Sequence, residues 1–197
     1  SPRDLARALA ALSKLKVKPP EAAPHLDFLT EYVVAEKDRI LRLTAVAAGR
    51  KLDAKGFAER LRAKADGEDR DRTAYAIEAL GMVGGPDDVP RLLELAKSPS
   101  IAIGARACDA VAKIGWKKDA DVVIEIALGH EDLEIADHAT WAAVDLLGKP
   151  KVMLQKLFKA AGKDMGSPRG IRAKSIEAMI EDSGEAFAWD EAKSLDL

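Results

Sequence analysis

The chain has 197 residues, of which 48% are hydrophobic and only 5% aromatic. Small aliphatic side chains combined with 32% charged residues are typical of closely packed helices. A net charge of −2 excludes a uniformly basic surface of the kind that attracts nucleic acid. No run of about 18 apolar residues is present that could span a membrane. Cys108 is the only cysteine, which excludes an intramolecular disulfide.

Charge is distributed unevenly along the chain. Residues 1–66 carry 14 Lys and Arg against 9 Asp and Glu, a net charge of +5. Residues 67–132 carry 8 against 13, a net −5, and residues 133–197 carry 9 against 11, a net −2. This asymmetry could orient a partner, although most of these charges are expected to be solvated helix surface.

The first 66 residues are predicted to be helical but irregular. We expect a helix over 4–16 that ends before Pro19 and Pro20, and a long or broken helix over 25–49. A further helix is expected over 53–65, with Asp53 as its N-cap. We interpret residues 1–66 as degenerate repeats or a cap of the same domain as the residues that follow.

A repeat becomes visible from residue 67 onwards. Three segments end alike, in Leu-Gly or Ile-Gly, and their glycines Gly81, Gly115 and Gly148 are 34 and 33 residues apart. A glycine at such a position predicts a left-handed helix C-cap. Nine residues before the four equivalent endpoints stand Arg72, Arg106, Ala139 and Arg172. We expect the recurring arginine to be structural and to bind carbonyls or acids between repeats.

Each unit is predicted to contain two helices, the first ending at the glycine and rich in small residues. The second helix begins near Pro86, near Asp119 or Asp121, and near Pro150 in successive units. One such pair cannot cover its own apolar faces, so the pairs must stack side by side. The fold class is therefore predicted to be all-α, an α-solenoid of HEAT-like antiparallel helix pairs.

The whole chain, residues 1–197, is expected to form one solenoid domain. Three regular repeats are predicted over 67–164, and a C-terminal repeat and cap over 165–197. The last two helices are expected at about 168–181 and 185–195, with Phe187 and Trp189 as anchors of the cap.

Residues 72–148 resemble the HEAT-like repeats of phycobilisome lyases. The resemblance lies in the recurring arginine, the alanine-rich helix, the Leu-Gly or Ile-Gly ending and the valine-containing second helix. It implies the solenoid fold. Similar repeats serve in lyases, scaffolds and regulatory subunits, so the resemblance does not select one activity.

One candidate metal site is present in the sequence. His130, Glu134 and His138 are spaced so that a continuous helix would bring them to one face, and two imidazoles with a carboxylate can hold zinc. Gly129 and Asp132, however, favour a helix that starts after His130. We assign no metal and no cofactor.

A second candidate is the pair Trp141 and Asp145, one helical turn apart. The pair resembles part of the site of alkylpurine DNA glycosylases built from HEAT-like repeats. Those enzymes also need a basic concave surface, because phosphate contacts dominate DNA affinity, and residues 67–148 are acidic here. We assign no catalytic residue.

The sequence thus predicts a non-catalytic scaffold or adaptor that binds another protein on the concave face of the solenoid. Nucleic acid is not an expected partner. The alternatives are a HEAT-like repeat enzyme, glycosylase-like or bilin lyase-like, and an obligate structural subunit of a larger assembly. A cytoplasmic location is favoured over export after processing. Helical phase places the expected contacts on the second helix of each pair: Arg91, Glu94, Asp121, Glu125, Gln155, Lys156 and Lys159.

Overall fold

The computed structural model describes residues 7–8, 11, 14 and 19–183, and every regular element in this part of the chain is helical. The prediction of an all-α chain is confirmed. None of these helices is long and apolar enough to cross a membrane. The expected helix at 4–16 falls mostly outside the described residues, and the one at 185–195, with Phe187 and Trp189, falls entirely outside them.

The helices are α2 (Pro19–Ala35), α3 (Arg39–Ala65), α4 (Arg70–Val83), α5 (Val89–Leu95), α6 (Ile101–Ile114), α7 (Ala120–Gly129), α8 (Leu133–Leu147), α9 (Pro150–Ala161) and α10 (Pro168–Asp182), with 3-10 turns Pro86–Asp88 and Lys117–Asp119 before α5 and α7.

Local capping sets several helix ends. Asp38, Asp69 and Asp132 each accept a hydrogen bond from the backbone N–H two residues further on, at 2.8, 3.0 and 2.9 Å. These bonds satisfy N–H groups that the first turns of α3, α4 and α8 leave unpaired. Gly115 and Gly148 end α6 and α8 with φ of 72° and 66°. Both predicted left-handed caps are therefore confirmed.

Gly81 does not cap a helix, and that prediction was wrong. It lies inside α4, which continues to Val83 and is capped by Gly84. A Cβ at Gly81 would lie 2.8 Å from the Cα of Ala110 in α6. The glycine is needed there because two helices approach closely, not because the backbone turns.

The N-terminal residues are divided differently from the prediction. The expected 25–49 helix is broken between Ala35 and Arg39, one of the two predicted possibilities, and its first part, α2, begins earlier, at Pro19. α3 is kinked at Asp53, whose φ and ψ are −162° and 97°. The side chain of Asp53 accepts a hydrogen bond from Gly56 N–H at 3.0 Å, so its predicted N-cap role is confirmed. α3 therefore consists of two successive helices, 39–52 and 54–65.

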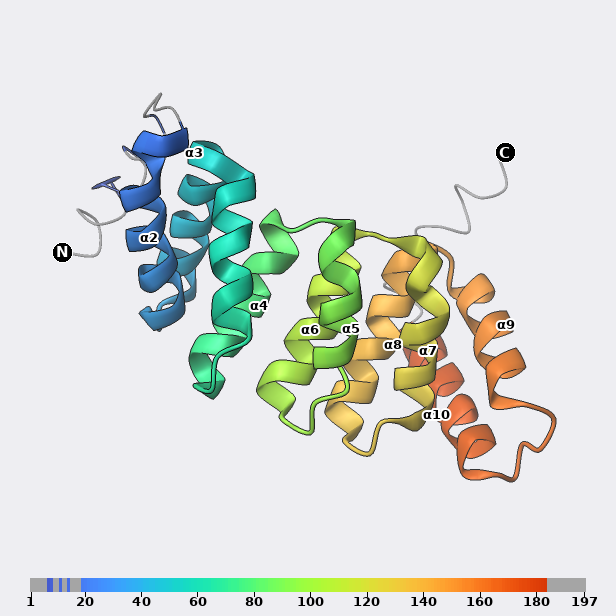
Figure 1. Cartoon of the computed structure of the whole chain (residues 1–197). Coiled ribbons are helices and arrows are strands. Elements are labelled where there is room, and N and C mark those ends of the chain that lie inside the picture. Colours follow the sequence, from blue (N-terminus) through green and yellow to red (C-terminus); the bar gives the residue numbers. More distant parts are fainter. Residues whose placement is uncertain (1–6, 9–10, 12–13, 15–18, 184–197) are drawn as a thin grey trace, which may run out of the picture.

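The helices form the two layers of a solenoid (Figure 1), as predicted. In the inner layer α4, α6 and α8 pack side by side. The second half of α3, with α5, α7 and α9, makes the outer layer, which stands in front in Figure 1. The antiparallel pairs are the second half of α3 with α4, α5 with α6, α7 with α8, and α9 with α10. The expected pairing began one helix later in the chain, because a repeat length does not show which helix of a pair comes first.

One hydrophobic core runs through the stack, from Ala22 in α2 to Ile180 in α10. Its inner-layer part is made largely of small residues such as Ala107, Ala110 and Ala139, all at most 1% exposed. Small side chains let neighbouring helices approach closely. The continuous core is what a single solenoid domain requires.

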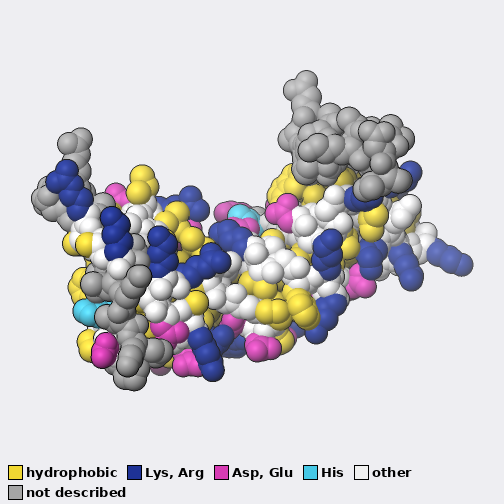
Figure 2. All heavy atoms as spheres, turned by 90° about the horizontal axis from the view of Figure 1, so that it is seen from above, with side chains coloured by type: hydrophobic (Ala, Val, Ile, Leu, Met, Phe, Trp, Pro, Cys, Tyr) yellow, Lys and Arg dark blue, Asp and Glu magenta, His cyan; other side chains and the backbone are white. Residues whose placement is uncertain are grey.

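The inner layer is hollowed near its middle (Figure 2). We had expected the second helices of the predicted pairs, α5, α7 and α9, to line the concave side. That placement was wrong, because these helices form the opposite layer and α4, α6 and α8 line the hollow.

Candidate protein-binding surfaces

The hollow contains a pocket of about 300 Å³ that is lined from four helices, α3, α4, α6 and α8. Charged side chains of both signs surround an exposed isoleucine. The lining residues used below are Arg39, Glu78, Ile101, Arg106, Asp109 and His138.

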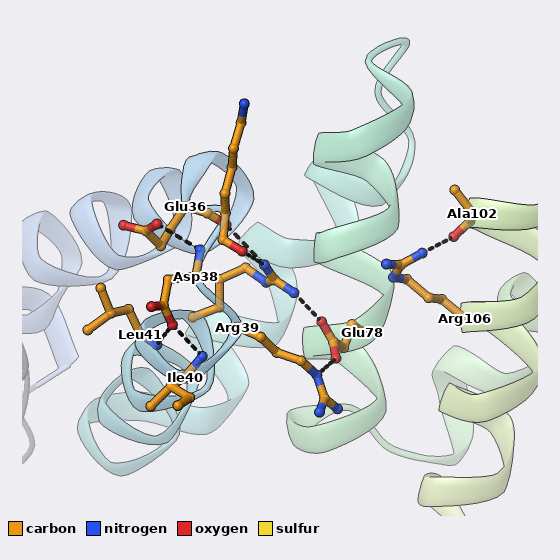
Figure 3. Close-up of polar contacts among 10 residues, drawn as sticks. Glu36, Asp38, Arg39, Ile40, Leu41, Glu78, Ala102 and Arg106 are labelled. Carbon is orange, nitrogen blue, oxygen red and sulfur yellow. Dashed lines mark hydrogen bonds and ion pairs between the residues drawn. The ribbon is translucent and has the colours of Figure 1, made fainter. Parts of the chain in front are cut away.

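Glu78 is the centre of a charge cluster at one side of this pocket (Figure 3). It accepts hydrogen bonds from Arg39 Nε at 2.9 Å and from Arg42 Nη2 at 3.0 Å. Arg42 also donates to the carbonyls of Glu36 and Lys37, at 3.1 and 3.0 Å, which ties the α2–α3 turn to α4. Burial raises the pKa of the Glu78 carboxyl, but the two arginines lower it more, so its pKa lies below the usual value. The cluster is therefore charged and fixed in position.

Arg106 extends from α6 toward α4 and is bonded differently (Figure 3). Its guanidinium donates to the carbonyl of Ala102 in the same helix at 3.0 Å. It also lies 5.9 Å from the ring centroid of Tyr75, a ring that Arg42 approaches to 3.9 Å. Among the described residues no carboxylate forms an ion pair with Arg106, nor with the exposed Lys113 about two helical turns further along α6. The hollow thus holds two cations without a carboxylate partner.

The recurring arginines otherwise join helices, as expected. Arg72 on α4 binds Glu31 on α2. Arg172 on α10 binds Asp137 on α8 at 3.0 Å and reaches the carbonyl of Ala127 on α7 at 3.4 Å. Arg106 departs from this rule, because its only backbone bond is within its own helix.

Ala139 on α8 stands at the position of the recurring arginine, and the adjacent His138 makes the contact between helices there. His138 Nδ1 on α8 lies 2.8 Å from Asp109 Oδ1 on α6. The α6–α8 contact at the hollow is therefore polar as well, and it is made by a residue next to Ala139.

The proposed metal ligands are not brought to one helix face. His130 follows the last residue of α7, whereas Glu134 and His138 lie in α8, which starts at Leu133 after its N-cap Asp132. Within 19–183 and the few described residues before it, no group of three His, Cys, Asp or Glu side chains is arranged to hold a metal ion.

Trp141 and Asp145 lie one turn apart on α8, as the sequence required. Burial of part of the Asp145 carboxyl, together with the nearby charge of Asp109, raises its pKa above the usual value. Cys108 is buried in α6, and burial raises the pKa of its thiol to about 12. A thiol with that pKa is not a nucleophile at neutral pH.

The contact residues predicted from helical phase all lie in the outer layer, on α5, α7 and α9. Most of them make ion pairs with exposed neighbours. Arg91 binds Asp66 at 2.7 Å, and Lys156 binds Asp121 at 2.7 Å. The structure brings four of the predicted residues together around a groove of about 450 Å³ between α7 and α9: Asp121, Glu125, Lys156 and Lys159. Arg91 and Glu94 lie apart from that groove on α5, and Gln155 is exposed on α9.

Sequence reasoning did not bring the residues that line the hollow together as a candidate site. Arg106 carried a signal, because it belongs to the recurring arginine positions, but the period alone does not show that it lacks an acidic partner. Ile101 and Asp109 carried none, since each is ordinary for the helix on which it stands, and His138 was noted only as a candidate metal ligand.

The family model of HEAT repeats matches residues 54–144. These residues run from the second half of α3 into α8, and they therefore begin with an outer helix and end with an inner one, as the pairs do in the structure. No curated protein matches the chain. The likeness to the repeats of phycobilisome lyases in particular stays a resemblance. Residues 54–144 of this all-helical solenoid are thus HEAT-like repeats.

Proposed function

We propose that this protein is a non-catalytic scaffold that holds another protein in the hollow of α4, α6 and α8. HEAT repeats commonly serve as protein-interaction scaffolds, and stacked repeats present extended concave surfaces. The observation that carries the proposal is Arg106, a half-buried guanidinium in the hollow whose bonds reach one carbonyl and one ring but no carboxylate among the described residues.

The chemistry of the hollow suggests an acidic segment as its occupant. A partner's carboxylate can form paired, charge-assisted hydrogen bonds with a guanidinium, and these are stronger than neutral ones. Ile101, which is 39% exposed and lines the same pocket, offers an apolar contact beside the charge. Lys113 adds a second positive charge on the same helix. An apolar anchor surrounded by complementary charge is the usual composition of an interface centre.

The test is charge reversal in the hollow. Tagged protein carrying Arg106→Glu or Lys113→Glu is purified from the source cells beside the wild type. Lys151→Glu on α9 is the control, since it makes the same charge change on an exposed helix outside the pockets described. Lys113 is exposed, so its reversal leaves the core unchanged, and circular dichroism checks both variants.

The scaffold proposal expects proteins that co-purify with wild type and with Lys151→Glu, but not with the two hollow variants. Co-purifying proteins that persist in all variants would place the binding elsewhere on the molecule. A wild-type protein that captures no partner under these conditions would remove the proposal itself.

The enzymatic alternative has one observation in its favour, the raised pKa of Asp145 beside Trp141. The purified protein can be assayed for excision of alkylated bases and for formation of a coloured complex with bilin. Excision that disappears in Asp145→Asn would replace the scaffold proposal. An obligate structural subunit would instead aggregate or fail to elute as a defined species when the chain is isolated.

A further inference from the structure

Ion pairs join α2 to α3 and the successive helices of the outer layer to one another, with one exception. Asp27 on α2 binds Arg60 on α3 at 2.6 Å, and Asp66 at the end of α3 binds Arg91 on α5 at 2.7 Å. The pair Asp121–Lys156 joins α7 to α9. Within the described residues no ion pair joins α5 to α7.

A groove of about 790 Å³ lies at this position and is lined from α7 of the outer layer. Its walls are the segment that follows α5, the exposed face of α7 and the turn between α7 and α8. The apolar part consists of Pro99, Val122 and Ile126, and Val122 is 39% exposed. Gly129 contributes only backbone because it has no side chain. A Cβ at this position would meet no heavy atom within 4 Å. The groove therefore has room for side chains that the chain itself does not supply.

The rim of the groove is negatively charged. Glu125, Glu131 and Asp132 line it, against Lys97 as the one lining lysine or arginine. Lys97 is already bound to Glu94 at 2.8 Å and Glu125 to Arg169 at 2.7 Å, whereas Glu131 and Asp132 form no ion pair among the described residues. With its histidine neutral, the lining carries a net charge of −2, within a stretch of the sequence that is itself acidic.

We infer that this groove is a second docking site, for a short peptide segment of another protein with aliphatic side chains flanked by lysine or arginine. The aliphatic groups cover Pro99 and Val122, both of which are exposed, and their burial removes apolar surface from water. The basic flanks face Glu131 and its neighbours, and they speed and orient the encounter more than they add affinity. The site is independent of the hollow proposed above.

Fluorescence anisotropy with a defined probe tests the site on the full chain. The probe is a labelled peptide with two leucines one helical turn apart, flanked by lysines. Two comparison peptides replace the lysines by glutamate or the leucines by serine. We expect the probe to bind more tightly than both, with an affinity that falls as salt rises.

Two variants and their matched controls locate the binding. Gly129→Leu places a side chain in the groove, where a Cβ meets nothing within 4 Å, and is expected to weaken binding at least about fivefold. Gly85→Leu is its control, because a Cβ at Gly85 also meets nothing within 4 Å. Glu131→Lys is expected to weaken binding about threefold and to reduce the salt dependence. Glu68→Lys, an exposed site elsewhere, makes the same change in net charge.

Several outcomes overturn the inference. Equal binding of the lysine and glutamate peptides would remove the charge argument, and unchanged binding in Gly129→Leu would place the peptide elsewhere. A wild-type dimer in sedimentation that dissociates in Gly129→Leu would make a second copy of this chain the occupant. Arg106→Glu is expected to leave peptide binding unchanged, so failure here and failure of the scaffold proposal are distinguishable.

Discussion

Replacing Gly81 by alanine tests whether the inner helices pack as closely as the structure shows. A Cβ at this position would lie 2.8 Å from the Cα and 2.9 Å from the Cβ of Ala110 on α6. Carbon atoms in favourable contact are about 3.5–4.0 Å apart, so α4 and α6 must separate by several tenths of an ångström. Because the nearest atom belongs to the backbone, no side-chain rotation relieves the contact.

The magnitude follows from two opposing effects. Alanine in place of glycine favours a helix by about 1 kcal/mol. Overpacking a close contact costs about 1–3 kcal/mol. We therefore expect Gly81→Ala to lower the free energy of unfolding by about 1 kcal/mol. Gly129→Ala, in the last residue of α7, has the helical gain without the contact, so it should be neutral or stabilising by up to about 1 kcal/mol.

The assay is urea unfolding followed by far-ultraviolet circular dichroism, with the two alanine variants compared directly. The comparison is informative because the helix-propensity effect is largely shared, so the difference of about 1–2 kcal/mol between the two variants reports the helix contact. Gly104→Ala should fall between them, since its Cβ would meet the flexible end of Ile135 at 2.7 Å. A Gly81→Ala protein as stable as Gly129→Ala would refute the close packing of α4 on α6.

Three further predictions concern buried polar groups. Burial raises the pKa of Asp88, but bonds from Arg62 and a backbone N–H lower it more, so its pKa is below the usual value. The stability it confers is complete above the unfolded-state pKa of about 3.9 and is lost as pH falls below it, and Asp88→Asn should unfold with a smaller acid dependence. Arg42→Met breaks a buried pair with Glu78 and should lower the free energy of unfolding in urea by about 3 kcal/mol. Cys108 should react with a thiol reagent only when the chain unfolds, so faster labelling in native buffer than in a urea-unfolded control would contradict its burial.

The features that local sequence determines were predictable. Gly115 and Gly148 follow the last turn of a helix with no competing role, and both proved to be left-handed caps. Asp53 was identified as an N-cap because the short side chain can bond the backbone three residues on without any tertiary partner. The solenoid itself was predictable from the period, because each recurring helix pair must pack against a neighbouring pair to cover its apolar faces.

The features that depend on packing between helices were not predictable in the same way. Gly81 occupies the same place in the repeat as the two capping glycines, yet it is retained for the contact with Ala110, which only the neighbouring helix reveals. The period also leaves the start of each pair undetermined, so the helices that carry Arg91 and Lys156 were assigned to the hollow instead of the opposite layer. Whether Arg106 has an acidic partner depends on the side chains that the fold brings beside it. The repeat shows only the features that the units have in common.

Site-specific photo-crosslinking in the source cells tests the central claim most directly. A photoreactive amino acid at position 113, in the hollow, is compared with the same residue at position 151 on the outer helix α9. The account predicts a discrete crosslinked protein from position 113 and none from position 151. Crosslinks from position 151 alone, or none from position 113, would contradict a scaffold that holds its partner between α4, α6 and α8.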